Sequence, residues 1–308
     1  MKIDKMEWFQ ITFRYKGSVI PSILFRVLCC GLFGFLISLI YHYYKFPLAA
    51  KSLESVVPSI VLGLLLVFRT NTAYERFWEG RKCWGTLVNT VRNLARQIWV
   101  SVEENEPEDR TKKIAALRLL VAFCVATKLH LRGQLMNSEL EELMSEDQYF
   151  KLKTMNNPPL EVAFWIADYL QQQHDRDRLP IYQLTAINNL VNIMVDMLGA
   201  CERILKTPIP LAYAIHLKQL LLIYCLLLPF QMVNNLGWGT GPIVGLISFT
   251  LFGIEEIGIE IENPFGHDPN DLPLDAICAT MRRNIEDLIS LSPSVHSSVN
   301  DLKKIDRK

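Results

Sequence analysis

The sequence predicts an all-α fold in which four transmembrane helices form a bundle that is continuous with a cytoplasmic helical domain. Three observations support this fold class: charged residues are missing from long stretches, cations gather on one side of those stretches, and apolar residues recur at helical spacing elsewhere. The 308-residue chain is 50% apolar, and its 32 basic residues balance its 32 acidic ones. This neutral balance, without a Lys/Arg-rich block, argues against nucleic acid as a partner.

The predicted membrane helices come from runs that contain no Lys, Arg, Asp or Glu, at residues 27–44, 55–68 and 219–254. Helices in lipid lose such residues because each costs about 2.5–3.5 kcal/mol at the bilayer centre. The third run is broken at 234–242 by the sequence NNLGWGTGP, which predicts a tight turn between two spans. We therefore predict four membrane helices, at approximately residues 22–44, 54–79, 211–232 and 239–256.

The second uncharged run is too short to cross lipid by itself. A hydrocarbon core of about 30 Å needs roughly 20 helical residues, whereas the run at 55–68 has 14. It is either a buried core helix of a soluble protein or an inner helix of a membrane bundle that continues into water. The two longer neighbouring runs favour the inner helix.

The orientation follows from cations near the ends of the spans, because Lys and Arg stay on the cytoplasmic side. The cations that precede the first span or follow the second are Lys2, Lys5, Arg14, Lys16, Arg26, Arg69, Arg76, Arg81, Lys82 and Arg92. Only Lys45 and Lys51 lie between these spans, and the turn near 231–242 has none. We expect a multi-pass protein of the cell membrane or an internal membrane, with both termini cytoplasmic.

The remaining residues, 80–206 and 257–308, are predicted to form the cytoplasmic helical region. Apolar residues recur by three and four in 111–131 and again in 179–206, as in amphipathic helices. Asn137 or Ser138 is expected to cap a helix. The sequences at 156–159 and 178–180 predict breaks between helices.

The sequence offers little support for an enzyme. Its six histidines lack H-E-x-x-H spacing, and neither a phosphate-binding glycine loop nor a G-x-S-x-G motif occurs. The seven cysteines lack C-x-x-C spacing and are predicted to be reduced. His216 is interpreted as an interfacial anchor, and Asp196 and Glu202 as structural acids that pair with an arginine such as Arg203 or cap a helix.

Two segments carry more unusual patterns. Residues 68–81 change abruptly from an apolar run to alternating charges and aromatics, which an amphipathic helix with ion pairs three or four residues apart would explain. Residues 260–275 are rich in acids, Pro and Gly. Such an oxygen-rich loop could bind calcium, which takes six to eight oxygen ligands, or could be a solvated turn.

Together these segments resemble the bestrophin family of anion channels. The matching pieces occur in the family's order, and they are RYKGS at 14–18, the pattern R-x-N-x-x-Y-x-R-F-W-E-x-R at 69–81, TPIP at 207–210 and NPFG at 263–266. The length is similar to that of the bacterial and plant-organelle branch. The whole of 1–308 would then be a single channel subunit.

The resemblance implies a homopentamer around a central pore. In the family the second membrane helix lines a hydrophobic neck, and this pattern falls on Val57, Val61 and Leu65, with Pro58 in the proline position. The shortness of the second span independently predicts a central place for it. Rings of apolar side chains can gate a narrow pore by dewetting.

The resemblance also bears on calcium, which animal members bind through consecutive acids after NPFG. Here only Asp268 and Asp271 remain, as a reduced version of this calcium clasp. We expect calcium to bind weakly or not at all, and no other cofactor or metal.

The expected function is passive flow of chloride and bicarbonate through the neck. Its partners would be further copies of the chain, chloride or other small anions, and the lipid bilayer. A second constriction is expected near the start of the 179–206 helix. Two alternatives remain: a cation-selective channel of the same architecture, and a membrane-anchored helical scaffold without a pore.

Overall fold

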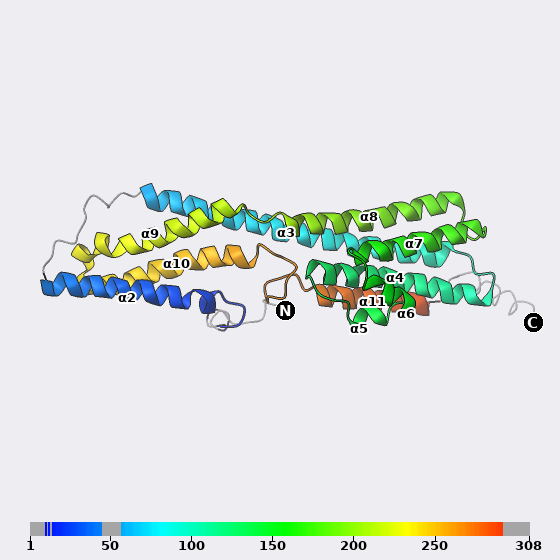
Figure 1. Ribbon diagram of the computed structural model, residues 1–308, viewed down its shortest axis with the longest axis horizontal. Coiled ribbons are helices and arrows are strands. Elements are labelled where there is room, and N and C mark those ends of the chain that lie inside the picture. Colours follow the sequence, from blue (N-terminus) through cyan, green and yellow to red (C-terminus); the bar gives the residue numbers. More distant parts are fainter. Residues whose placement is uncertain (1–9, 11, 13, 45–56, 292–308) are drawn as a thin grey trace, which may run out of the picture. The chain divides into compact units, whose positions relative to one another are not determined.

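The computed structural model describes residues 10, 12, 14–44 and 57–291, in which all regular secondary structure is helical (Figure 1). The predicted all-α fold class is therefore confirmed. The chain forms two compact units. The first unit is Met1–Glu79 with Thr207–Asp271, and the second is Gly80–Lys206 with Leu272–Lys308.

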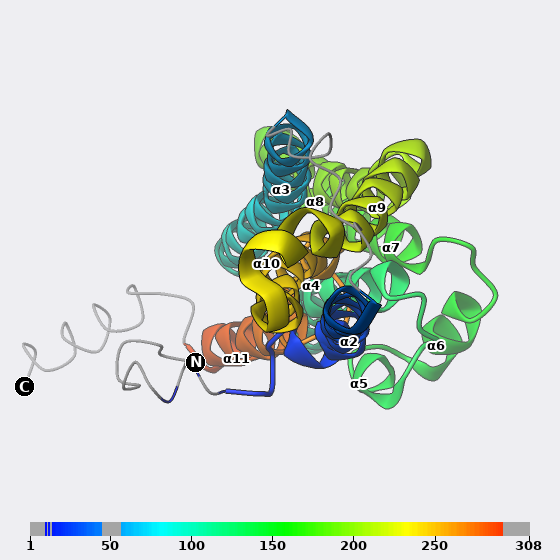
Figure 2. The ribbon, with the colours of Figure 1, turned by 90° about the vertical axis from the view of Figure 1, so that its left-hand side faces the viewer.

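The first unit contains long apolar helices. They are α2 (Ile20–Tyr44), the first half of α3 (Val57–Ser101), α9 (Leu211–Leu236) and α10 (Thr240–Glu260). Helices α2 and α10 pack most closely, α9 contacts both, and α3 lies on the other side of this group from α2 in both views (Figures 1 and 2). Their shared core includes Ile23, Leu62, Leu66, Leu221, Cys225, Val244 and Phe252.

Glycines allow the close approach of α2 and α10. A Cβ added to Gly241 would lie 3.1 Å from the carbonyl oxygen of Gly31 and 3.1 Å from both the backbone nitrogen and Cβ of Phe35. Gly34 faces Gly241 in turn, with a Cβ-to-Cα distance of 3.2 Å. Small residues commonly let membrane helices pack backbone to backbone in this way.

Replacing Gly241 with alanine is expected to separate α2 from α10 and to cost about 1–3 kcal/mol, as in other overpacked sites. Two of the three close atoms belong to backbone, so they cannot move aside as a flexible side chain would. Gly199→Ala in α8 is the matched control, because nothing lies within 4 Å of its added Cβ. Thermal unfolding in detergent compares the two variants; equal midpoints would contradict this account of the packing.

The turn between α9 and α10 is shorter than the sequence predicted. Helix α9 continues through Asn234 and Asn235 to Leu236, and only the 3₁₀ turn Gly237–Gly239 separates it from α10. Gly237 has a φ of 51°, which favours glycine. Its carbonyl accepts hydrogen bonds from the hydroxyls of Ser38 (3.0 Å) and Thr240 (2.8 Å). These hydroxyls satisfy the Gly237 carbonyl, so the turn needs no further residues. The Asn and Pro residues of the sequence had suggested a longer loop.

The second unit is a helical body around α4. It contains the second half of α3, α4 (Pro107–Leu131), α5 (Ser138–Glu141), α6 (Glu146–Leu152), α7 (Pro158–Asp175), α8 (Ile181–Lys206) and α11 (Leu274–Ser290). The predicted N-cap is confirmed, since the Asn137 side chain accepts a hydrogen bond from the backbone of Leu140. Asn157 likewise caps α7, where a break was predicted.

Five helical segments of the described chain are long and apolar enough to cross a membrane, and two of them, α4 and α8, belong to the second unit. Protein buries 78% of the apolar window of α4, against 22–28% in the segments of the first unit and α3. Helix α8 buries one stripe and exposes polar residues such as Asn192 and Asp196 on its other side. The apolar residues of these two helices therefore build a protein core.

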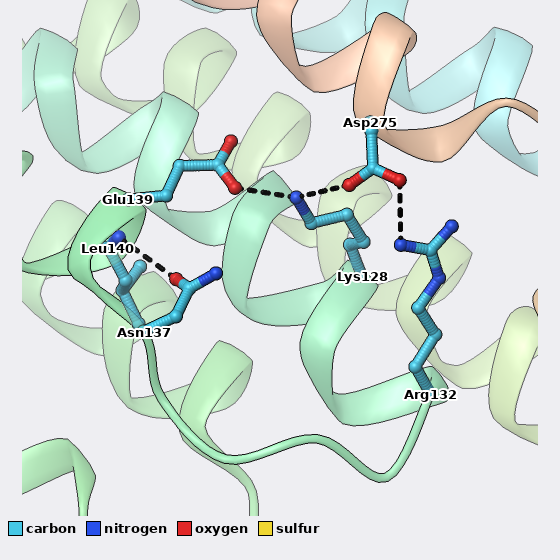
Figure 3. Close-up of polar contacts among 6 residues, drawn as sticks. All are labelled: Lys128, Arg132, Asn137, Glu139, Leu140 and Asp275. Carbon is cyan, nitrogen blue, oxygen red and sulfur yellow. Dashed lines mark hydrogen bonds and ion pairs between the residues drawn. The ribbon is translucent and has the colours of Figure 1, made fainter. Parts of the chain in front are cut away.

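A cluster of charges joins α4, α5 and α11 (Figure 3). Lys128 of α4 is only 2% exposed, and its ammonium donates to Glu139 at 2.6 Å and to Asp275 at 2.9 Å. The other oxygen of Asp275 accepts from Arg132 at 2.9 Å. Asp275 lies in the first turn of α11, so one carboxylate fixes the start of this helix to α4.

Candidate functional site

Helix α3 is apolar on two sides within the first unit. One side is buried by its own chain through Leu62, Leu66 and Ala73. The other side carries Val57, Val61 and Phe68, which are 65%, 46% and 62% exposed. A membrane-spanning helix with an uncovered apolar side has to face lipid, a neighbouring subunit or a narrow pore.

The predicted neck residues do not all lie on this uncovered side. Val57 and Val61 do, whereas Leu65 is half-buried and packs against the core. The reason is helical geometry: each step of four residues turns the side chain by about 40° beyond a full revolution. Leu64 and Phe68 return to the line of Val57, and both are exposed. Val57, Val61, Leu64 and Phe68 are spaced by four, three and four residues, as expected for one face of a helix, so the sequence could have indicated them. The family pattern repeats every four residues and led to Leu65 instead.

A hydrogen bond from α9 fixes α3 at the level of Leu65. The Tyr213 hydroxyl donates to the carbonyl oxygen of Leu65 at 2.6 Å. The carbonyl has two lone pairs, so it can accept this bond in addition to its helical one. The bond ties the middle of the apolar part of α3 to the first turn of α9.

Below this apolar part, a buried ion pair joins α3 to the end of α10. Arg69 is 5% exposed and donates through Nη2 to Glu262 Oε2 at 2.8 Å. Its Nη1 has no hydrogen-bond partner among the described residues. A Cβ at Gly258 would lie 3.3 Å from the Arg69 side chain, so the guanidinium passes close to the backbone of α10. Breaking such a pair on one side leaves a buried charge without its partner.

Glu262 also holds the segment that leads into α9. Its Oε1 accepts from the backbone N–H of Ile209 at 2.9 Å, and its carbonyl accepts from Arg76 Nε at 3.1 Å. Arg76 additionally donates to the carbonyl of Thr207. We name this arrangement of Arg69, Arg76, Thr207, Ile209 and Glu262 the junction network.

The junction network explains three sequence motifs that lie far apart in the chain. The motifs at 69–81, 207–210 and the acidic segment after the last span meet at one place in the first unit. Ion pairs within a single helix were the simpler interpretation of the first motif. The structure instead directs Arg69 across to α10, which spacing alone could not indicate.

The loop after α10 positions Asp268 and Asp271 within its own hydrogen bonds. Asp271 Oδ2 accepts from the backbone N–H of Asp268 at 2.8 Å, and the backbone N–H of Asp271 donates to the Asp268 carbonyl at 3.0 Å. A Cβ at Gly266 would lie 2.6 Å from Asp271 Oδ2, so the turn requires glycine there. Asn270 further ties the loop to Glu260 at 2.6 Å.

The hydrogen bonds of this loop use one of the carboxylate oxygens that a calcium site would need. Calcium takes six to eight oxygens at about 2.3–2.6 Å, whereas one Asp271 oxygen is committed to a backbone N–H within the turn. Among the described residues, no three His, Cys, Asp or Glu side chains form a metal-binding group. The Asp271 carboxylate and the Asp268 backbone stabilise the turn.

Glu202 contacts partners on three sides. Its Oε1 lies 2.7 Å from His130 Nε2 and accepts from Asn157 at 3.0 Å, while Lys206 approaches Oε2 at 3.4 Å. Burial would raise the pKa of Glu202, but these partners lower it below its ordinary value. The acid joins α8 to α4 and α7, a structural role as expected. The seven cysteines are free thiols, as predicted.

Comparison with known proteins agrees with this architecture. Residues 1–287 match the model of a family described as bacterial/fungal bestrophin proteins. The chain is 69% identical over 297 residues to a voltage-dependent anion channel-forming protein of Nostoc sp., covering 96% of each chain. It is 63% identical over 287 residues to one of Synechocystis sp., covering 93% of each chain.

The fold is also found in solved structures. A crystal structure of a bacterial bestrophin homolog from Klebsiella pneumoniae is 29% identical, covers 88% of this chain and 100% of its own, and has a TM-score of 0.78. The relatives have the names of channel-forming proteins and not of enzymes. From the match over residues 1–287 and these relatives, the chain belongs to the bestrophin family.

Proposed function

We propose that this protein is a homopentameric channel that passes chloride and bicarbonate passively across a membrane. The observation that carries the proposal is the apolar side of α3 that the chain itself leaves uncovered, together with relatives that are named as anion channel-forming proteins. Five copies of this side around an axis would form a hydrophobic neck. An ion entering it would lose part of its hydration shell, so small changes in width would gate conduction.

In this proposal Val57, Val61 and Leu65 line the neck, and Leu64 and Phe68 extend it. Val57 and Val61 present their side chains outward, and Tyr213 holds the Leu65 backbone in place. Ile181 and Tyr182 are exposed at the start of α8, where a second constriction was expected, and they are its proposed residues. Both termini, the 80–206 region and the segment after α10 would be cytoplasmic, according to the distribution of cations.

Planar-bilayer recording of the purified protein under a potassium chloride gradient tests the proposal. The Val57/Val61/Leu65→Ala variant is expected to carry severalfold larger currents at an unchanged reversal potential near that of chloride, because it widens the apolar ring. Val67→Ala is the matched control. Val67 is also exposed and apolar, but it lies about 80° around the helix from Val57.

Two outcomes would overturn the proposal in different ways. If the Val67→Ala control increased the currents equally, the neck would not be formed by Val57, Val61 and Leu65. Verified insertion without current, together with a mass other than that of a pentamer, would favour the scaffold.

One observation favours the cation-selective alternative. Glu75 and Glu79 are exposed and continue the line of Val57 along α3, so a pore on this side would have two acids per subunit beyond the apolar part. Rings of carboxylates are typical of cation channels. A reversal potential near that of potassium, which shifts towards chloride in Glu75→Gln, would establish this alternative.

A further inference from the structure

A groove between α3 and α11 in the second unit has the features of an anion-binding site. Its cavity of about 430 Å³ is lined by Arg81, Gly85, Val88, Asn89, Arg92, Ala276, Ile277 and Thr280. This volume lies in the range of small-molecule sites, about 300–1,000 Å³. None of these eight lining residues is acidic, and the two arginines supply up to ten N–H donors.

The two arginines approach the groove from opposite ends of one helical face. Arg81 and Arg92 are separated by about 16 Å of helix rise, or three turns. Arg81 bends forward, since its Nη1 lies 3.3 Å from the Cβ position at Gly85, one turn along. Arg92 lines the same groove beyond Asn89. The two arginines therefore border the stretch between Gly85 and Asn89 from both ends and converge on one cavity.

Gly85 makes room for this convergence. A glycine within a helix costs roughly 0.5–1 kcal/mol relative to alanine, and here a Cβ would press on the Arg81 guanidinium. The missing side chain opens the groove at the point where an anion would lie. The Asn89 amide adds a neutral donor from the α3 wall. The Thr280 hydroxyl of the α11 wall already donates to the Ala276 carbonyl at 2.8 Å.

Within the part of the chain that the structure describes, the two arginines have no carboxylate partner. Neither Arg81 nor Arg92 forms an ion pair within residues 14–44 and 57–291. The buried cations Lys113, Lys128 and Arg178 of the second unit are, in contrast, each paired with an acid. Two converging guanidinium groups match the oxygens of a phosphate, because each can donate two parallel hydrogen bonds.

We infer that this groove binds a small organic phosphate. The phosphate would lie between Arg81 and Arg92, and an apolar body would rest on Val88, Ala276 and Ile277. The apolar wall distinguishes this ligand from chloride or inorganic phosphate, which would leave it in contact with water. The inference concerns binding at the second unit and does not depend on conduction through α3.

Isothermal titration of the purified full-length protein with phenyl phosphate, at constant ionic strength, tests the site. Arg81→Gln and Arg92→Gln are each expected to weaken binding at least tenfold, because each removes charge-assisted hydrogen bonds. The Arg81→Lys/Arg92→Lys variant keeps both charges but loses the paired N–H donors of the guanidinium groups. It should therefore also bind more weakly than wild type. Inorganic phosphate should bind more weakly than phenyl phosphate.

Arg96→Gln is the matched control, because Arg96 is an exposed arginine of the same helix that does not line the groove. Its affinity should stay within twofold of wild type, and all variants should unfold at similar temperatures without ligand. Equal weakening in Arg96→Gln would overturn the site in favour of general attraction to a basic surface. If wild type did not bind phenyl phosphate and the double glutamine variant assembled differently, the inference would be wrong. The groove would then be a contact surface for another copy of the chain.

Discussion

Replacing Glu262 with alanine is expected to lower the free energy of unfolding by about 3 kcal/mol, the lower end of the range for one-sided loss of a buried ion pair. Arg69 would keep its buried charge but lose its only described carboxylate, and its Nη1 already has no partner. The backbone N–H of Ile209 would lose its acceptor as well. The partial exposure of Glu262, 18%, is the reason for choosing the lower end of the range.

A double variant distinguishes the loss of the ion pair from general damage to the packing. The Arg69→Met/Glu262→Leu variant removes both charges, so it should be more stable than Glu262→Ala alone. Glu75→Gln, on an exposed position of the same helix α3, should stay within about 0.5 kcal/mol of wild type. Thermal unfolding in detergent supplies the measurement. Glu262→Ala unfolding at the temperature of Glu75→Gln would show that the junction network contributes nothing to stability.

Replacing Asp275 with alanine should destabilise the second unit by about 1 kcal/mol near neutral pH. The change removes charge-assisted hydrogen bonds to Lys128 and Arg132, and solvent weakens them because the Asp275 side chain is 65% exposed. The buried Lys128 would retain Glu139 as its remaining partner. Asp287→Ala, at an exposed position of the same helix α11, is the control and should have little effect.

The pH dependence of this effect follows from the pKa of Asp275. Burial would raise this pKa, but Lys128 and Arg132 outweigh burial and lower it from 3.8 to about 2. Because the pKa is lower in the folded chain, the carboxylate stabilises the fold above pH 3.8, and this stabilisation is lost as pH falls towards 2. The difference in unfolding temperature between wild type and Asp275→Ala should therefore shrink over this interval. A difference that stays constant would contradict the assigned role of the charge.

The sequence predicted the helices of the first unit well because lipid imposes a strong rule. Ionisable residues are excluded from the hydrocarbon core, so residues 27–44 and 219–254 stand out without knowledge of any contact. The run at 55–68 was harder, since its helix continues without a break to Ser101. Charge marks where a helix leaves lipid, but it does not mark where the helix ends.

The candidate site was predictable only in part. The family pattern falls on Val57, Val61 and Leu65, but which of them stays exposed depends on how α9 and α10 pack against α3. The junction network depends on a contact between residues 193 positions apart, Arg69 and Glu262. No acid lies three or four residues from Arg69 in the sequence, and no physical rule of sequence indicates the distant Glu262 as its partner. The groove at Arg81 and Arg92 had no sequence signal beyond two basic residues, because its other wall comes from α11.

The separation of Arg69 and Glu262 also has a consequence for how the protein is made. At a synthesis rate of about 5–20 residues per second, the 193 residues between them take roughly 10–40 s to translate. Throughout this time Arg69 has been made, but its carboxylate partner has not. The nascent second span must keep this guanidinium in contact with water or phospholipid headgroups until α10 has been inserted. Biosynthesis of the membrane unit is thus completed by its last span, whose arrival allows the arginine to become buried.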